Sequence, residues 1–160
     1  NHKSSWGILT AKWLPRVLAD NGYADDVMKV FTQSETPSCW GYWEKIGATT
    51  FWEDWTGLNS CNHIMYGDIS AWFYEYLGGI KPTSKTPGFA EFTIAPKFVK
   101  CLNYVRVEYE SVKGKIEVEW ERQKDGTIAL KGEVPQGAVA DIVLPDGVKC
   151  AISGHFQYNA

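Results

Sequence analysis

Two neighbouring acids between tryptophans are the residues of this sequence best suited to chemistry. Glu53 and Asp54 stand between Trp52 and Trp55, in a stretch that carries no other charged residue. An indole offers a flat apolar face to the C–H side of a sugar ring, while a carboxylate takes a proton from water or holds a hydroxyl group. The pattern indicates sugar chemistry. It is also typical of a helix start, with a threonine cap and an acid in the first turn.

Further motifs occur around this pair in a fixed order. They are Pro37-Ser38 and Trp40, the run from Gly47 to Trp55, Cys61-Asn62-His63 with Gly67, Gly79-Ile80-Lys81-Pro82, Pro87-Gly88-Phe89, Ile94-Ala95-Pro96, the turn from Ser111 to Gly114, Trp120, Pro135 and Leu144-Pro145. In this order they resemble the α-L-rhamnosidases of glycoside hydrolase family 78, which have the signature Gly-Ala-Thr-Thr-x-Trp-Glu-x-Trp. The resemblance covers nearly the whole chain, and an ordered set of motifs is more specific than any single one.

The resemblance implies an α+β fold in two parts. Family members have an (α/α)6 catalytic barrel followed by a C-terminal antiparallel β-sandwich, and they are commonly several hundred residues longer on the N-terminal side. We therefore interpret the chain as a C-terminal fragment of such an enzyme. Residues 1–81 are assigned to the last helices of the barrel and residues 82–160 to the β-sandwich domain.

The chemistry implied by the resemblance is removal of terminal α-L-rhamnose with inversion. The reaction needs a proton for the departing oxygen and a base for the attacking water, which come from two carboxyl groups. By resemblance, Glu53 is the general base, His63 contacts the bound sugar, and the general acid lies in an upstream segment that is missing here. Trp52, Trp55 and Trp40 are candidate sugar contacts, although core packing is the commoner fate of tryptophan. The chain alone is expected to be inactive, and no cofactor or metal is implied.

Two other functions stay open at this point. One is a carbohydrate-binding or structural interaction module, because the predicted strands carry glutamates and aromatic residues; burial of Trp120 would argue against this alternative. The other is an (α/α)6 hydrolase that acts on another sugar, since a fold does not determine a substrate. For Asp54 we favour a plain solvent-facing or helix-start charge. The structural alternative for His63 is that it caps the third predicted helix or bonds a backbone carbonyl.

Composition and charge argue against several kinds of partner. With 160 residues, of which 44% are hydrophobic, the chain can bury the core of one domain or of two small ones. A net charge of −3 without a lysine and arginine cluster argues against nucleic acid. No apolar run reaches the roughly 18 residues that a membrane span needs. The localisation stays open, because a fragment says nothing about the start of its parent.

The cysteine spacing argues against a zinc site. Cys39, Cys61, Cys101 and Cys150 are widely separated and form no Cys-x-x-Cys pair. We expect four free thiols that behave as small apolar residues. The pair to check for a disulfide is Cys39 with Cys61, because both flank the predicted site.

Apolar periodicity predicts three helices in the first half of the chain. The first runs from Ser5 to Leu18, is kinked by Pro15 and stops at Asn21-Gly22. Its predicted buried stripe comprises Trp6, Leu9, Trp13, Leu14, Val17 and Leu18. The others cover residues 24–34 and 64–77. Helices from an incomplete barrel expose apolar surface, which the missing part of the enzyme or self-association is expected to cover.

Beyond Pro82 the apolar residues alternate, as they do in strands. The clearest hairpin joins residues 104–109 to residues 115–120 around Lys113-Gly114. Further strands are predicted at 127–134, 138–144 and 148–158. Short strands separated by regular turns favour a β-sandwich.

Overall fold

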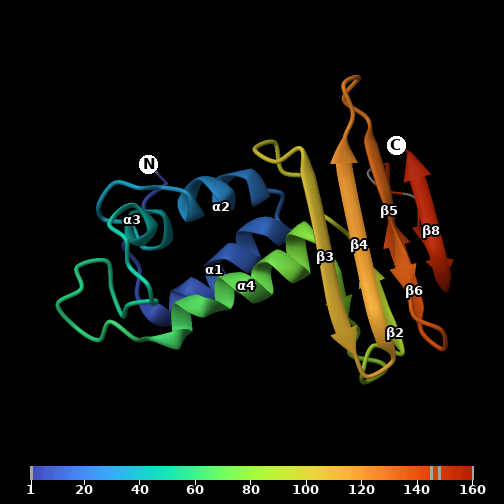
Figure 1. The fold of residues 1–160 in the computed structure, drawn as a ribbon, viewed down its shortest axis with the longest axis horizontal. Helices are drawn as coiled ribbons and strands as arrows, with labels where there is room; N and C mark the ends of the chain where they lie inside the picture. Colours follow the sequence, from blue (N-terminus) through green and yellow to red (C-terminus); the bar gives the residue numbers. More distant parts are fainter. Residues whose placement is uncertain (1, 145, 148, 160) are drawn as a thin grey trace. The chain divides into compact units, whose positions relative to one another are not determined.

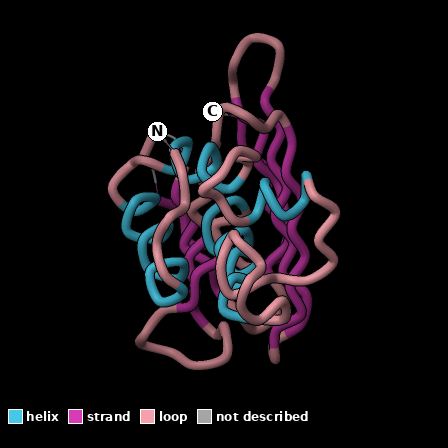
Figure 2. Tube along the Cα trace, turned by 90° about the vertical axis from the view of Figure 1, so that its left-hand side faces the viewer, coloured by secondary structure: helices cyan, strands magenta, loops and turns pink. Residues whose placement is uncertain are grey.

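The computed structural model describes residues 2–144, 146–147 and 149–159. The chain divides between Trp72 and Phe73 into two compact units. The first is built from helices and loops, and the second mainly from strands, as Figure 1 and Figure 2 show. The α+β class predicted from the sequence is therefore confirmed.

The first unit is helical. Its elements are α1 (Ile8–Asp20), α2 (Ala24–Phe31), α3 (Trp40–Lys45), the 3-10 helix η1 (Ile64–Asp68) and α4 (Ile69–Trp72). The stop predicted after α1 is confirmed, because Asn21 is its C-cap and Gly22 has a φ of +89°, which favours glycine. α2 ends at Phe31 rather than at residue 34, and the Thr32 hydroxyl donates a hydrogen bond to the carbonyl of Met28.

The buried face predicted for α1 is wrong. The helix starts at Ile8 instead of residue 5, and its buried residues are the small Ala11 and Ala19 together with Pro15. Leu9, Trp13 and Val17 are instead exposed, at 70%, 61% and 54%. Small side chains let α1 lie close to α2 and η1 within this unit, so the large apolar residues are left on another face.

Pro15, which is predicted to kink the first helix, does not break it. It lies in the interior of α1, which continues to Asp20 without a break. Its carbonyl accepts a hydrogen bond from the indole nitrogen of Trp72 at 3.2 Å. Proline in a helix interior normally costs a backbone hydrogen bond, so this side-chain bond to α4 offsets part of the cost.

Aromatic rings fill the core of the first unit. Phe31 meets Trp40 and Trp72 edge to face, with ring centroids 4.8 and 5.1 Å apart. Trp40 in turn meets Tyr66 at 5.3 Å, and its indole nitrogen donates to the Tyr66 carbonyl at 2.9 Å. Edge-to-face pairs add to the stabilisation from burial alone. This cluster fixes α3, a helix that the sequence did not predict because six residues show no periodicity.

The second unit is a β-sandwich, preceded by a helical turn, η2 (Phe73–Leu77). Its strands are β1 (Ile80–Pro82), β2 (Glu91–Ile94), β3 (Tyr104–Ser111), β4 (Gly114–Arg122), β5 (Ile128–Val134), β6 (Val139–Val143), β7 (Lys149–Ile152) and β8 (Gly154–Asn159). They form two four-stranded sheets, ordered β1-β2-β6-β7 and β3-β4-β5-β8. The predicted antiparallel pairing holds for every other strand pair of the described residues, whereas β2 and β6 are parallel and are joined by a crossover through three strands of the other sheet.

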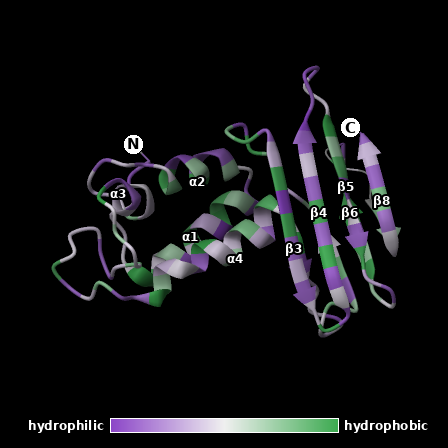
Figure 3. Ribbon diagram, in the orientation of Figure 1, coloured by the Kyte–Doolittle hydropathy of each residue, from purple (hydrophilic) through white to green (hydrophobic). Residues whose placement is uncertain are grey.

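The predicted hairpin is confirmed as β3 and β4, paired from Tyr104 with Glu121 to Ser111 with Gly114. Figure 3 shows hydrophobic and hydrophilic residues alternating along β3. The single strand predicted at 148–158 is wrong, because β7 and β8 belong to different sheets. The chain changes sheet at Gly154, whose φ of +87° few other residues adopt.

Candidate functional site

The signature residues lie in a loop that folds back on itself. The Glu53 amide donates to the Ser60 carbonyl at 2.8 Å, and the His63 amide donates to the Phe51 carbonyl at 2.7 Å. Residues 50–53 and 60–63 therefore run side by side in opposite directions. The alternative of a helix start at Thr49 or Thr50 is wrong, since no helix begins between α3 and η1 in this described stretch.

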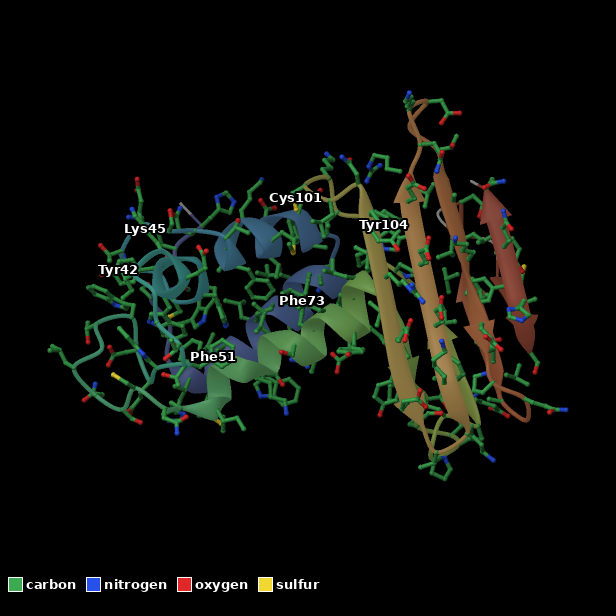
Figure 4. All side chains as sticks on the ribbon, viewed as in Figure 1. Tyr42, Lys45, Phe51, Phe73, Cys101 and Tyr104 are labelled. Atoms are coloured by element: carbon green, nitrogen blue, oxygen red, sulfur yellow. The ribbon has the colours of Figure 1, made fainter. Side chains whose placement is uncertain are left out.

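A cavity of about 490 Å³ lies between α3 and this folded loop. It is lined by Trp40, Trp43, Glu44, Ala48, Thr49, Thr50, Phe51, Asn62, His63 and Ile64. Figure 4 labels Phe51, which contributes one aromatic wall. Small-molecule sites have similar volumes and combine apolar walls with a few polar groups. The cavity therefore suits a ligand of monosaccharide size.

The structure brings together only part of the predicted site. Trp40 and His63 both line the cavity, whereas Glu53, Trp52 and Trp55 are not among its lining residues. Glu53 is half-buried and follows Phe51 closely on the same backbone segment. Its carboxylate accepts a long hydrogen bond of 3.4 Å from the Ser60 amide. Glu53 is thus two residues along the chain from a residue that lines the cavity, and its carboxylate makes only a weak hydrogen bond with the protein.

Trp52 packs within its own loop. A side chain at Gly57 would place its Cβ 2.6 Å from the Trp52 ring, and Gly57 has a φ of +69°. Glycine has no Cβ and readily adopts a positive φ, so it allows the indole to lie directly on the Gly57 backbone. Trp52 also lies near Trp43, with ring centroids 6.2 Å apart. Trp55 is half-buried on the same loop.

Asp54 organises the loop, and its interpretation as a helix-start charge is wrong, because no helix begins in this described stretch. Its Oδ1 accepts hydrogen bonds from the amide of Thr56, at 2.7 Å, and from the Thr56 hydroxyl. Its Oδ2 accepts from the side-chain amide of Asn59 at 2.5 Å. The hydroxyl of Thr56 first, and then Asn59, hold the pKa of Asp54 below its ordinary value of 3.8. The carboxylate closes the turn that follows Glu53.

We expect the loop to open when Asp54 is protonated. A carboxylate whose pKa is lowered in the folded state stabilises that state above the ordinary pKa, and this stabilisation is lost as the pH falls through the folded pKa. The Thr56 and Asn59 amide signals in NMR spectra should thus be constant above about pH 5 and move below about pH 4. Asp54→Asn should abolish that movement, while Asp125→Asn, which alters a similar turn at Thr127, should not. Signals that stay fixed to pH 2 would contradict this role.

Glu44 is the charged residue of the cavity lining, and it is not in the predicted set. It belongs to the same short helix as Trp40 and Trp43. Residues three and four apart lie on one face of a helix, so Trp43 and Glu44 follow Trp40 toward the same cavity. The sequence did not indicate Glu44 because α3 was not predicted. The spacing of Glu44 from Trp40 places both on one face only if the segment is helical.

The four cysteines are free, as predicted. The alternative of a disulfide between Cys39 and Cys61 is wrong, since Cys39 is buried and Cys61 is exposed on the folded loop. Burial raises the pKa of the Cys39 thiol. The Cys61 thiol lies 3.6 Å from the Gly57 carbonyl, which it bonds within the loop.

Among the described residues, no three histidine, cysteine, aspartate or glutamate side chains are grouped so as to hold a metal ion. No helix in the same ranges has the length and apolar character needed to cross a membrane.

Two family models match the chain in succession. The bacterial α-L-rhamnosidase 6 hairpin glycosidase domain matches residues 1–77, and the bacterial α-L-rhamnosidase C-terminal domain matches residues 79–158. A relative from Alteromonas sp. (strain LOR), an α-L-rhamnosidase, is 35% identical over 150 residues, which are 87% of this chain and 16% of the relative. The chain therefore spans about a sixth of that relative's length.

Solved structures of α-L-rhamnosidases have the same fold over this region. The native enzyme from Aspergillus terreus is similar with a TM-score of 0.89 and 26% identity, over 98% of this chain and 20% of that one. The enzyme from Streptomyces avermitilis, solved in complex with L-rhamnose, is similar with a TM-score of 0.85 and 25% identity, over 99% of this chain and 18% of that one.

Proposed function

The chain belongs to the bacterial α-L-rhamnosidase family of glycosidases, and from this membership we propose that it is the C-terminal part of an enzyme that removes terminal α-L-rhamnose. The substrate would be an α-L-rhamnoside or a rhamnose-containing glycan. The observation that carries the proposal is the cavity, because segments on both sides of the signature loop, including Phe51 and His63, line one space of suitable size.

In the proposed mechanism Glu53 is the general base of an inverting hydrolysis. Its carboxylate takes a proton from water as that water attacks the anomeric carbon, while an acid from the upstream part protonates the departing oxygen. The long bond from Ser60 supports this role, since it leaves most of the acceptor capacity of Glu53 for water. Trp40 and His63 would contact the sugar from the cavity wall. The roles of Trp52 and Trp55 as sugar contacts stay predictions.

We also propose that residues 1–81 complete an (α/α)6 barrel and that residues 82–160 form the domain after it. The exposed stripe on α1 supports a missing barrel part. Leu9, Trp13 and Val17 recur every four residues, so they lie along one side of the helix, and each is more than half exposed. A row of large apolar side chains in water favours association. Its partner would be the upstream part of the same enzyme or, in its absence, a second copy of this chain.

The isolated chain is expected to self-associate through the α1 stripe. Trp13→Glu places a charge in the middle of the stripe and should shift the chain toward monomer in sedimentation velocity measured over a range of concentrations. Val112→Glu, at a residue 86% exposed in the β3–β4 turn, is the matched control and should leave the association unchanged. A wild-type chain that is a monodisperse monomer at all concentrations would contradict the proposal.

The binding-module alternative ranks second for a specific reason. Trp120 is 0% exposed, and its indole nitrogen donates to the Leu77 carbonyl at 2.8 Å inside the second unit. A carbohydrate platform needs its aromatic rings at the surface. The glutamates of the same hairpin form surface ion pairs instead, such as Glu119 with Lys131 at 2.9 Å.

The experiment that tests the proposed function is hydrolysis of a panel of 4-nitrophenyl glycosides by an enzyme that contains this whole chain together with an upstream barrel part. We expect turnover of the α-L-rhamnoside alone, with the β-anomer of rhamnose formed first in proton NMR spectra because the mechanism inverts. Faster turnover of another glycoside would show that the enzyme acts on that sugar and not on α-L-rhamnose. No turnover of any would favour the binding module.

A further inference from the structure

Glu44 is the carboxylate that lines the cavity, whereas Glu53 is not among the lining residues. It lies in the last turn of α3, where Trp40 and Trp43 supply two of the aromatic walls. Both tryptophans are nearly buried, at 8% and 3% exposure, so their positions are fixed by packing. Glu44 is exposed at the same cavity. An acceptor is therefore presented from a rigid element toward a partly aromatic space.

Within the described residues, the Glu44 side chain has no hydrogen bond or ion pair with protein. The Glu44 backbone carbonyl accepts a hydrogen bond from the Gly47 amide at 3.1 Å, which leaves the carboxylate itself unengaged. Other carboxylates are engaged by the protein, as Asp54 is by Thr56 and Asn59 and as Glu119 is by Lys131. A free carboxylate beside a cavity can accept hydrogen bonds from a ligand without first breaking bonds to its own chain.

The remaining lining residues define the ligand. Phe51 is 38% exposed, so its ring can meet the C–H face of a pyranose, while the nearly buried Trp40 and Trp43 line the same cavity. Asn62 and His63 add polar groups that can donate as well as accept. Two oxygens of one carboxylate can take hydrogen bonds from two neighbouring hydroxyl groups, which is a pattern that a sugar ring offers and an apolar compound lacks.

We propose that Glu44 is a specificity-determining residue that binds neighbouring hydroxyl groups of the sugar ring in this cavity. The inference rests on the proposed function for the identity of the sugar, and it adds a residue that the signature motif does not contain. Glu44 acts here in binding and not in the bond-breaking step, which is left to Glu53 and the upstream acid. Losing it should therefore weaken binding much more than it slows the bound substrate.

The direct test is binding of methyl α-L-rhamnoside to the full chain, followed by the indole N–H signals in NMR spectra. The signals of Trp40 and Trp43 report on the cavity, and that of Trp120 in the other unit is an internal control. Glu44→Gln keeps the size and removes the charge, so we expect binding to weaken about tenfold to a hundredfold. Glu35→Gln makes the same change of charge on an exposed loop and should bind like wild type.

Two results would overturn the proposal. One is equal affinity of wild type and Glu44→Gln. The other is a wild-type chain in which the Trp40 and Trp43 signals do not move at saturating sugar, because the cavity would then take no sugar at all. If Glu44→Gln loses its folded spectrum, Glu44→Asp is the second variant, since it keeps the charge but withdraws the oxygens by one methylene; unchanged affinity there counts against the proposal.

Kinetics of the longer enzyme separate this inference from the proposed function. Glu44→Gln should raise KM about tenfold or more with kcat nearly unchanged, whereas Glu53→Gln should lower kcat. A raised KM in the first variant with full activity in the second would retain Glu44 and reject Glu53 as base. An unchanged KM in Glu44→Gln together with a lowered kcat in Glu53→Gln would retain Glu53 as base and reject Glu44.

Discussion

Glu53→Gln is expected to slow hydrolysis of an aryl α-L-rhamnoside by about 10²–10⁴-fold, with substrate binding retained. Glutamine has nearly the same size and can still accept the long bond from the Ser60 amide, so the loop should keep its shape. What it cannot do is take a proton from water. The measurement is kcat and KM of the enzyme that contains this chain, with Glu35→Gln as the control on an exposed loop.

The pH profile separates loss of a base from loss of structure. A general base gives the acidic limb of the kcat/KM profile, because its protonation removes activity. In Glu53→Gln that limb should disappear from whatever activity remains. An unchanged rate would move the base to another residue and leave the Glu53 loop a structural role. A loss of binding together with rate would indicate that the loop itself had been disturbed.

The motif predicted which segments form the site but not which side chains meet there. Trp40 and His63 line one cavity although they lie on different elements, whereas Glu53 from the same motif does not line it. The placement of Glu53 depends on how the loop closes, and that closure is set by Asp54 with Thr56 and Asn59. Such local side-chain bonds leave no periodic signal in a sequence.

Glu44 shows a second limit of the sequence. Its spacing from Trp40 has meaning only on a helix, and α3 has six residues, which is too short for an apolar period to be recognised. The structure supplies the helix through the ring contacts of Trp40 and Trp43 with Tyr66, a residue that follows the loop. Tertiary contacts, and not local preference, therefore create this part of the site.

Prediction of the fold succeeded where one face of an element is buried and the other is in water. In β4, buried Ile116, Val118 and Trp120 alternate with glutamates, and that strand was predicted. It failed for β1 and β2, which have three and four residues. It also failed for the buried face of α1, where small residues point inward, since a hydrophobic period does not say which of two apolar faces the fold covers.

Trp120→Ala is expected to destabilise the second unit by about 3–5 kcal/mol, which is a large fraction of the stability of a small domain. The side chain is fully buried, and its ring meets that of Phe98 edge to face at 5.4 Å. Its removal leaves a cavity and also leaves the Leu77 carbonyl without its donor. The measurement is urea unfolding of the full chain followed by circular dichroism in the far ultraviolet.

Two further variants divide this loss between packing and hydrogen bonding. Trp120→Phe keeps much of the ring but removes the N–H group, so it should cost about 1–3 kcal/mol for the unpaired Leu77 carbonyl in addition to the smaller loss of volume. Tyr104→Ala, at a half-exposed residue of the neighbouring strand β3, should cost much less. If Trp120→Ala is as mild as Tyr104→Ala, the ring does not hold this unit together. The reason for ranking the binding module second, which is that Trp120 belongs to the core, would then be lost.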